Sequence, residues 1–158
     1  MSTAIENNNS LEQNKKLVEQ FITLTWQQGR FNLAKNLIRR DFKYHVSLLN
    51  QTLEYDMAAK VMQNIRDSME DFEVMREDII AEGNRVVTQS SFCGTLVRPM
   101  MGFKPNANVV TFSAVSFWEI KKGLILSSNT LLDTAELMRQ MNHQSNNLAI
   151  DIEELNSR

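Results

Sequence analysis

What the 158-residue sequence lacks narrows the kind of protein it encodes. A single cysteine excludes an internal disulfide, and the absence of any basic run, with a net charge of −2, argues against nucleic acid as a partner. No apolar run approaches the ~20 residues of a membrane-spanning helix. The polar first residues, MSTAIENNNS, lack the apolar core of a signal peptide. We therefore expect a cytoplasmic protein with neither a nucleic-acid nor a membrane partner.

The composition, 42% hydrophobic and 23% charged, is that of one globular domain. Ser10, followed three residues later by Gln13, forms a capping-box pattern typical of a helix start. We therefore expect residues 1–9 to be a disordered tail, residues 10–142 to form the domain, and the polar residues 143–158 to be a C-terminal tail.

Hydrophobic periodicity within this domain predicts helices followed by strands. The expected helices are 10–28, 32–38, 56–69 and 134–142, and the expected strands are 41–46, 72–82, 85–97, 109–120 and 124–132. Turn signals at 83–84 and 121–123 join the later strands as hairpins, and alternation slips near 78–80, which suggests a bulge. This order predicts an α+β fold in which a curved antiparallel sheet wraps on the N-terminal helices into a cone with an internal pocket.

The last strand carries a polar stripe that ends in a carboxylate. Because strand side chains alternate, Ser127, Asn129, Leu131 and Asp133 share one face. In an apolar pocket the pKa of Asp133 would rise, and the carboxyl group could serve as both base and acid. Asp133 also precedes a helix, with Glu136 three residues on, so it could equally be a helix cap. Both roles stay open at this point.

Other residues could complete such a pocket. Phe92 and Trp118 would supply apolar walls, and Asn129 could orient a carbonyl group of a substrate. An apolar loop with Met101 and Phe103 could cover the cone mouth, or form an interface between subunits. We expect no metal site, because the second histidine lies in the C-terminal tail.

A series of short motifs, in a characteristic order, extends over residues 13–141. In chain order they are Gly29-Arg30-Phe31, Asp41-Phe42 with Tyr44-His45, Ala81-Glu82-Gly83-Asn84-Arg85-Val86-Val87, Gly94-Thr95, Gly102 with Pro105, Gly123 with Ile125, and Asp133 with Leu137 and Gln140. In this order and spacing the chain resembles the SnoaL-like polyketide cyclases, within the cone fold named after nuclear transport factor 2.

The resemblance implies a role for Asp133 as the acid/base of an intramolecular aldol condensation that needs no cofactor. It also implies that His45 faces the cavity as a substrate contact and that the protein is a homodimer. The chain departs from the family pattern at three places. Asn129 stands where an aromatic residue is common, Ser116 where an acid or histidine is frequent, and Leu96 where a histidine often occurs.

The leading hypothesis is therefore a cyclase or isomerase acting on a small, apolar, polyketide-like carbonyl compound. Asp133 would be catalytic, and the substrate contacts would be His45, Asn129, Ser116, Phe92, Trp118, Met101 and Phe103. The first alternative is a non-catalytic module of the same fold that binds a small ligand or mediates dimerisation. The second is an epoxide hydrolase-like enzyme that uses Asp133 with Arg66 or Arg98.

Overall fold

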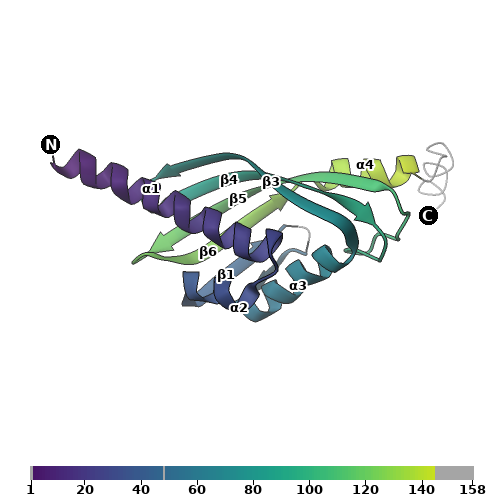
Figure 1. Ribbon diagram of the computed structural model, residues 1–158, viewed down its shortest axis with the longest axis horizontal. Helices are drawn as coiled ribbons and strands as arrows, with labels where there is room; N and C mark the ends of the chain where they lie inside the picture. The colour runs from purple at the N-terminus through teal and green to yellow at the C-terminus, as the bar shows by residue number, and fades with distance from the viewer. Residues whose placement is uncertain (1, 48, 145–158) are drawn as a thin grey trace.

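The computed structural model describes residues 2–47 and 49–144. Its elements, in order, are α1 (Ser2–Ile22), η1 (Thr23–Gln27), α2 (Phe31–Ala34), η2 (Lys35–Leu37), β1 (Ile38–Val46), β2 (Gln51–Leu53), α3 (Tyr55–Asp67), β3 (Met69–Glu82), β4 (Arg85–Leu96), β5 (Val109–Lys121), β6 (Leu124–Leu132) and α4 (Thr134–Gln144). Figure 1 shows one long sheet with α1, α2 and α3 over one face, and with α4 at the end away from the N-terminus. The predicted α+β fold is confirmed.

The six strands form one sheet in the order β2-β1-β6-β5-β4-β3. β3 to β6 are antiparallel neighbours, as the turn signals predict, whereas β1 lies parallel to β6. The register of β3 against β4 shifts between Arg76 and Asp78, close to the slip in the sequence pattern. Bulges of this kind increase the local twist and bend a strand, which helps the sheet to curve.

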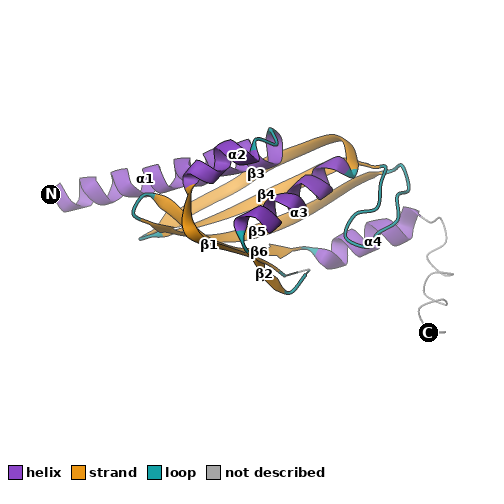
Figure 2. Cartoon of the chain, turned by 90° about the horizontal axis from the view of Figure 1, so that it is seen from below, coloured by secondary structure: helices purple, strands orange, loops and turns teal. Residues whose placement is uncertain are grey.

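The core lies between the sheet and the helices above it. Phe21 of α1 is fully buried and packs against Phe42, Tyr55 and Trp118, with ring centroids 5.5 to 6.3 Å apart. Figure 2 shows α1, α2 and α3 covering this face of the sheet. Burying an aromatic side chain of this kind contributes roughly 1.5–3 kcal/mol, so these contacts hold the helical layer on the sheet.

The ends of the chain differ from the sequence-based expectation. Residues 2–9 are helical, because no glycine or proline precedes Gly29 to interrupt α1, and the prediction of a disordered tail there is wrong. None of the described helices is long and apolar enough to cross a membrane. Helix α4 runs to Gln144, and residues 145–158 of the predicted C-terminal tail lie outside the described residues.

Arg66 fastens α3 to the end of the first helix. Its Nε donates a hydrogen bond to the carbonyl oxygen of Trp26 at 2.9 Å, and Nη2 donates to that of Gln27 at 3.4 Å. Gly29 follows with a φ of +66°, and a Cβ there would collide with the guanidinium of Arg66. Glycine at this position therefore meets the backbone requirement of a positive φ, and any larger residue would also displace the guanidinium of Arg66.

Candidate functional site

A small cavity lies inside the cone, between α1, η1 and α3 on one side and the concave face of the sheet on the other. Its volume is about 40 Å³. Drug-sized ligands occupy pockets of about 300 Å³ or more, whereas a water molecule needs roughly 10–15 Å³. The cavity in this conformation therefore has room for a few water molecules, and a ligand must displace side chains to enter.

Aromatic and aliphatic side chains form most of the cavity wall. Trp26 contacts Phe92 edge-on, with ring centroids 4.9 Å apart, and Phe92 stacks on Phe112, with ring centroids 5.1 Å apart. Trp26 reaches this position from the π-helical turn η1 at the end of α1. Helical turns with this wider hydrogen-bond pattern occur frequently at functional sites.

A row of hydroxyl groups crosses the concave face within this apolar wall. Thr130 on β6, Ser116 on β5 and Thr88 on β4 are neighbours in register, and all three are buried at the cavity. Ser116 Oγ lies 2.8 Å from Thr130 Oγ1, which donates a hydrogen bond to the phenol oxygen of Tyr44 at 3.3 Å. Trp118 Nε1 donates to Thr88 Oγ1 at 2.9 Å.

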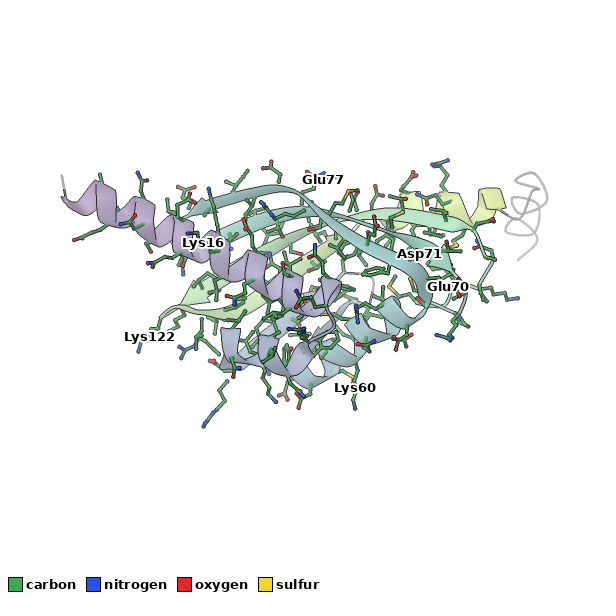
Figure 3. All side chains as sticks on the ribbon, in the orientation of Figure 1. Lys16, Lys60, Glu70, Asp71, Glu77 and Lys122 are labelled. Carbon is green, nitrogen blue, oxygen red and sulfur yellow. The ribbon has the colours of Figure 1, made fainter. Side chains whose placement is uncertain are left out.

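Tyr44 is the one ionisable side chain among the described residues that line the cavity. Burial raises its pKa above the usual value of 10, although the hydrogen bond from Thr130 acts in the opposite direction. At neutral pH the phenol therefore keeps its proton and can donate a hydrogen bond to a ligand. The charged side chains labelled in Figure 3 lie around the outside of the cone.

Asp133 lies outside the cavity, on the other side of the sheet from the hydroxyl row. Its side chain is exposed, and Oδ1 accepts a hydrogen bond from the backbone N–H of Glu136 at 3.1 Å. The carboxylate therefore caps α4, which is one of the two roles left open by the sequence. The expectation that its strand face lines the cone interior is wrong.

A bulge at Leu126 explains this error. Ile120 pairs with Ile125, but Glu119 pairs with Ser127, so β6 carries one extra residue relative to β5. One extra residue sends every later side chain to the opposite face of the sheet. Ser128 and Thr130 consequently point inward, while Asn129 and Leu131 point outward.

The other predicted contacts divide between the two faces of the sheet. Ser116, Phe92, Trp118 and Met101 all line the cavity. His45 and Asn129 pair in register but do not line it, and His45 Nδ1 lies 3.2 Å from Thr52 Oγ1. Phe103 packs against the core without lining the cavity. The expectation of a cavity-facing His45 and Asn129 is therefore corrected.

Tyr44, Thr130 and Thr88 are cavity residues that sequence reasoning missed. The alternation of Phe42, Tyr44 and Val46 places Tyr44 on the buried face, so its position is readable from the strand pattern. Thr130 and Thr88 become recognisable only once their register with Ser116 is known.

A two-residue turn brings Met101 to the cavity. Met100 and Phe103 exchange two backbone hydrogen bonds of 3.0 and 2.8 Å, with Met101 and Gly102 between them. Met101 has a φ of +48°, a conformation that costs a non-glycine residue roughly 1–2 kcal/mol. Met100 is buried in the core, so the turn is anchored beside the cavity while Met101 forms part of its wall.

The arginines considered for an epoxide hydrolase-like site are engaged elsewhere. Arg66 binds the carbonyl groups at the end of η1, and Arg98 Nη1 donates to the carbonyl oxygen of Asp67 at 2.8 Å. Neither lines the cavity. The described part of the chain also contains no cluster of three or more histidine, cysteine, aspartate or glutamate residues that could hold a metal ion.

Comparison with known proteins identifies the relatives of this cone. The family description "SnoaL-like polyketide cyclase" matches residues 16–141. The chain belongs to the SnoaL-like polyketide cyclase family. A search of curated proteins finds no match.

Solved structures share the fold of this SnoaL-like chain. A putative SnoaL-like polyketide cyclase from Jannaschia sp. CCS1 is 22% identical, with a TM-score of 0.72 over 80% of this chain and 90% of that chain. AclR, a putative hydroxylase from Streptomyces galilaeus, is 16% identical, with a TM-score of 0.70 over 84% and 86%. An LEH-like epoxide hydrolase from M. tuberculosis is 15% identical, with a TM-score of 0.66 over 90% and 98%. At these identities the likeness shows the cone fold alone.

Proposed function

We propose that this SnoaL-family protein binds a small, uncharged and largely apolar molecule inside the cone. The observation that carries the proposal is the chemistry of the cavity wall. Its described side chains are aromatic or aliphatic, apart from buried hydroxyl groups and the indole N–H of Trp118. A charged ligand would lose its hydration without gaining a counter-ion, which is costly. An uncharged molecule with one polar group suits this surface.

The family name favours a second candidate, the cofactor-independent aldol cyclisation of a small carbonyl compound. That reaction needs a base within hydrogen-bond reach of the substrate. Asp133 caps α4 on the other side of the sheet, and the buried phenol of Tyr44 stays protonated at neutral pH. The wall therefore supports binding better than it supports this acid/base chemistry.

Intrinsic fluorescence can test the binding proposal, because both tryptophans of the chain line the cavity. Titration with cyclopentanone, a small neutral probe, should change the emission saturably in the wild type. Ala114→Leu or the milder Ala114→Val should weaken the response, since Ala114 is buried at the cavity wall. Val115→Leu, on the adjacent outward-facing position of β5, is the matched control and should respond like wild type. Equal responses in all variants would refute binding in the cone.

The cyclase candidate needs a separate assay. Heptane-2,6-dione can cyclise by an intramolecular aldol reaction and then lose water to give an enone, whose absorbance is easily followed. Under the binding proposal we expect no enone formation above the buffer rate. Protein-dependent turnover that disappears in Asp133→Asn would favour the cyclase instead.

The homodimer expected from the resemblance stays a prediction. The outer face of the sheet exposes apolar side chains that a second copy could cover, with Phe117 40% and Leu131 49% exposed on neighbouring strands. Light scattering during size-exclusion chromatography would give the mass of the wild type and of Phe117→Glu. A dimeric wild type and a monomeric variant are expected, and a monomeric wild type would end this prediction.

A further inference from the structure

We propose that the cavity contains an acceptor-selective subsite, in which the O–H group of Tyr44 or that of Thr88 donates a hydrogen bond to a neutral oxygen such as that of a ketone, an aldehyde or an ether. This inference rests on the proposed function, because it names the polar group that the bound molecule carries. It follows from counting the protons in two buried hydrogen-bond chains.

The first chain runs from β5 through β6 to β1. Thr130 donates its only hydroxyl proton to the Tyr44 oxygen, so the 2.8 Å hydrogen bond with Ser116 must be donated by Ser116. The proton order is therefore Ser116 to Thr130 to Tyr44. The Tyr44 proton then has no acceptor among the side chains and backbone groups of the described residues, and Tyr44 is only 4% exposed.

The second chain starts at an indole. Trp118 has one N–H group and no acceptor on its ring, so Trp118 can only donate, and it donates to Thr88. Thr88 is 1% exposed, and its own proton likewise has no acceptor in the described part of the chain. Both chains therefore end in a donor at the cavity wall.

The two hydroxyl groups without an acceptor, those of Tyr44 and Thr88, select the kind of ligand. A buried donor without a partner costs about 1–3 kcal/mol, and a carbonyl or ether oxygen supplies the missing lone pairs. A carboxylate would also accept hydrogen bonds from these hydroxyl groups. However, no cationic side chain among the described cavity residues offsets the loss of its hydration. The raised pKa of Tyr44 keeps its donor in place through neutral pH.

Two probes of nearly equal shape test this subsite. Cyclopentanone carries a carbonyl oxygen where methylenecyclopentane carries a CH₂ group, and tryptophan fluorescence reports the binding of each. Tyr44→Phe should lower the affinity for cyclopentanone about tenfold, and it should leave the affinity for methylenecyclopentane unchanged or slightly higher. Tyr55→Phe is the matched control, because the Tyr55 hydroxyl donates to the Phe31 carbonyl oxygen away from the cavity, and it should change neither affinity.

Infrared spectroscopy adds a readout that a purely structural role would not affect. The carbonyl stretch of bound cyclopentanone should lie below its frequency in an apolar solvent, and Tyr44→Phe should return it part of the way. Equal effects of Tyr44→Phe on both probes, or an unshifted stretch, would overturn the inference while leaving cavity binding intact. If the wild type binds neither probe, both the inference and the proposed function fail.

Discussion

The two faces of β6 carry similar residues and have opposite roles. Ser128 and Thr130 point into the cone and are buried, whereas Ser127 and Asn129 point outward beside them. Both faces of this strand carry small polar side chains, and each has a serine, so residue type alone does not distinguish the faces. What distinguishes them is the register with β5, which the bulge at Leu126 sets.

The sharpest test of this comparison uses adjacent aromatic residues on β5. Trp118 points inward, packs on Phe21 and is 3% exposed, whereas Phe117 points outward and is 40% exposed. Trp118→Ala should lower the free energy of unfolding by about 3–5 kcal/mol, and Phe117→Ala by less than about 1 kcal/mol. Urea unfolding of both variants measures the difference. Similar losses would mean that the outer face is covered as thoroughly as the inner one.

The hydroxyl row gives a smaller contrast. Thr130→Val keeps the shape of the side chain but removes the donor to Tyr44 and the acceptor for Ser116. We expect a loss of about 1–3 kcal/mol in the free energy of unfolding, because two buried groups lose their partner. Asn129→Ala, one position away on the outer face, should change it by less than about 0.5 kcal/mol. A neutral Thr130→Val would show that water already satisfies this chain.

Asp133 tests whether the outer position contributes anything beyond a cap. Asp133→Ala should cost about 1 kcal/mol, and Asp133→Asn much less, because asparagine also caps helices well. Neither variant should alter cyclopentanone binding, since Asp133 does not line the cavity. Unfolding curves and fluorescence titrations of both variants check this. Weakened binding in Asp133→Asn would connect the carboxylate to the cavity.

The smallest expected effect is the decrease in the free energy of unfolding at alkaline pH that comes from the buried tyrosines. Burial raises the pKa of Tyr44 above 10, and burial together with the charge of Asp56 raises that of Tyr55 to about 12. In the unfolded chain both tyrosines lose their protons near pH 10, so their contribution to stability is complete below pH 10 and decreases as the pH rises towards 12. Urea unfolding between pH 9 and 11.5 should show a shallower decrease in Tyr44→Phe than in the wild type. Parallel curves would mean that folding leaves the Tyr44 pKa unchanged.

Local patterns were sufficient for much of the fold. The strand expected at 41–46 is part of β1, where Phe42, Tyr44 and Val46 alternate on the buried face, and the Gly83-Asn84 pair and Gly123 marked two hairpin turns that the structure contains. The parallel pairing of β1 with β6 was not predicted, because it joins residues that are far apart in the sequence, such as Tyr44 and Ser128, through contacts with no local signal.

The site was harder to predict than the fold, for a related reason. The bulge at Leu126 depends on how β6 meets β5, and nothing in residues 124–133 alone reveals it. Strict alternation from Ile125 therefore assigned Asn129 and Asp133 to the interior. On β1, neighbouring side chains lie on opposite faces, and the resemblance drew attention to His45 although Tyr44 is the residue at the cavity.

The single extra residue at Leu126 also bears on how the lining of such a cavity can evolve. Loss of one codon there would rotate the remainder of β6 and exchange its hydroxyl side chains for Ser127, Asn129 and Leu131 at the concave face. A lineage could thus exchange the lining of its cone through strand length, without altering any of the amino acids that end up facing the ligand.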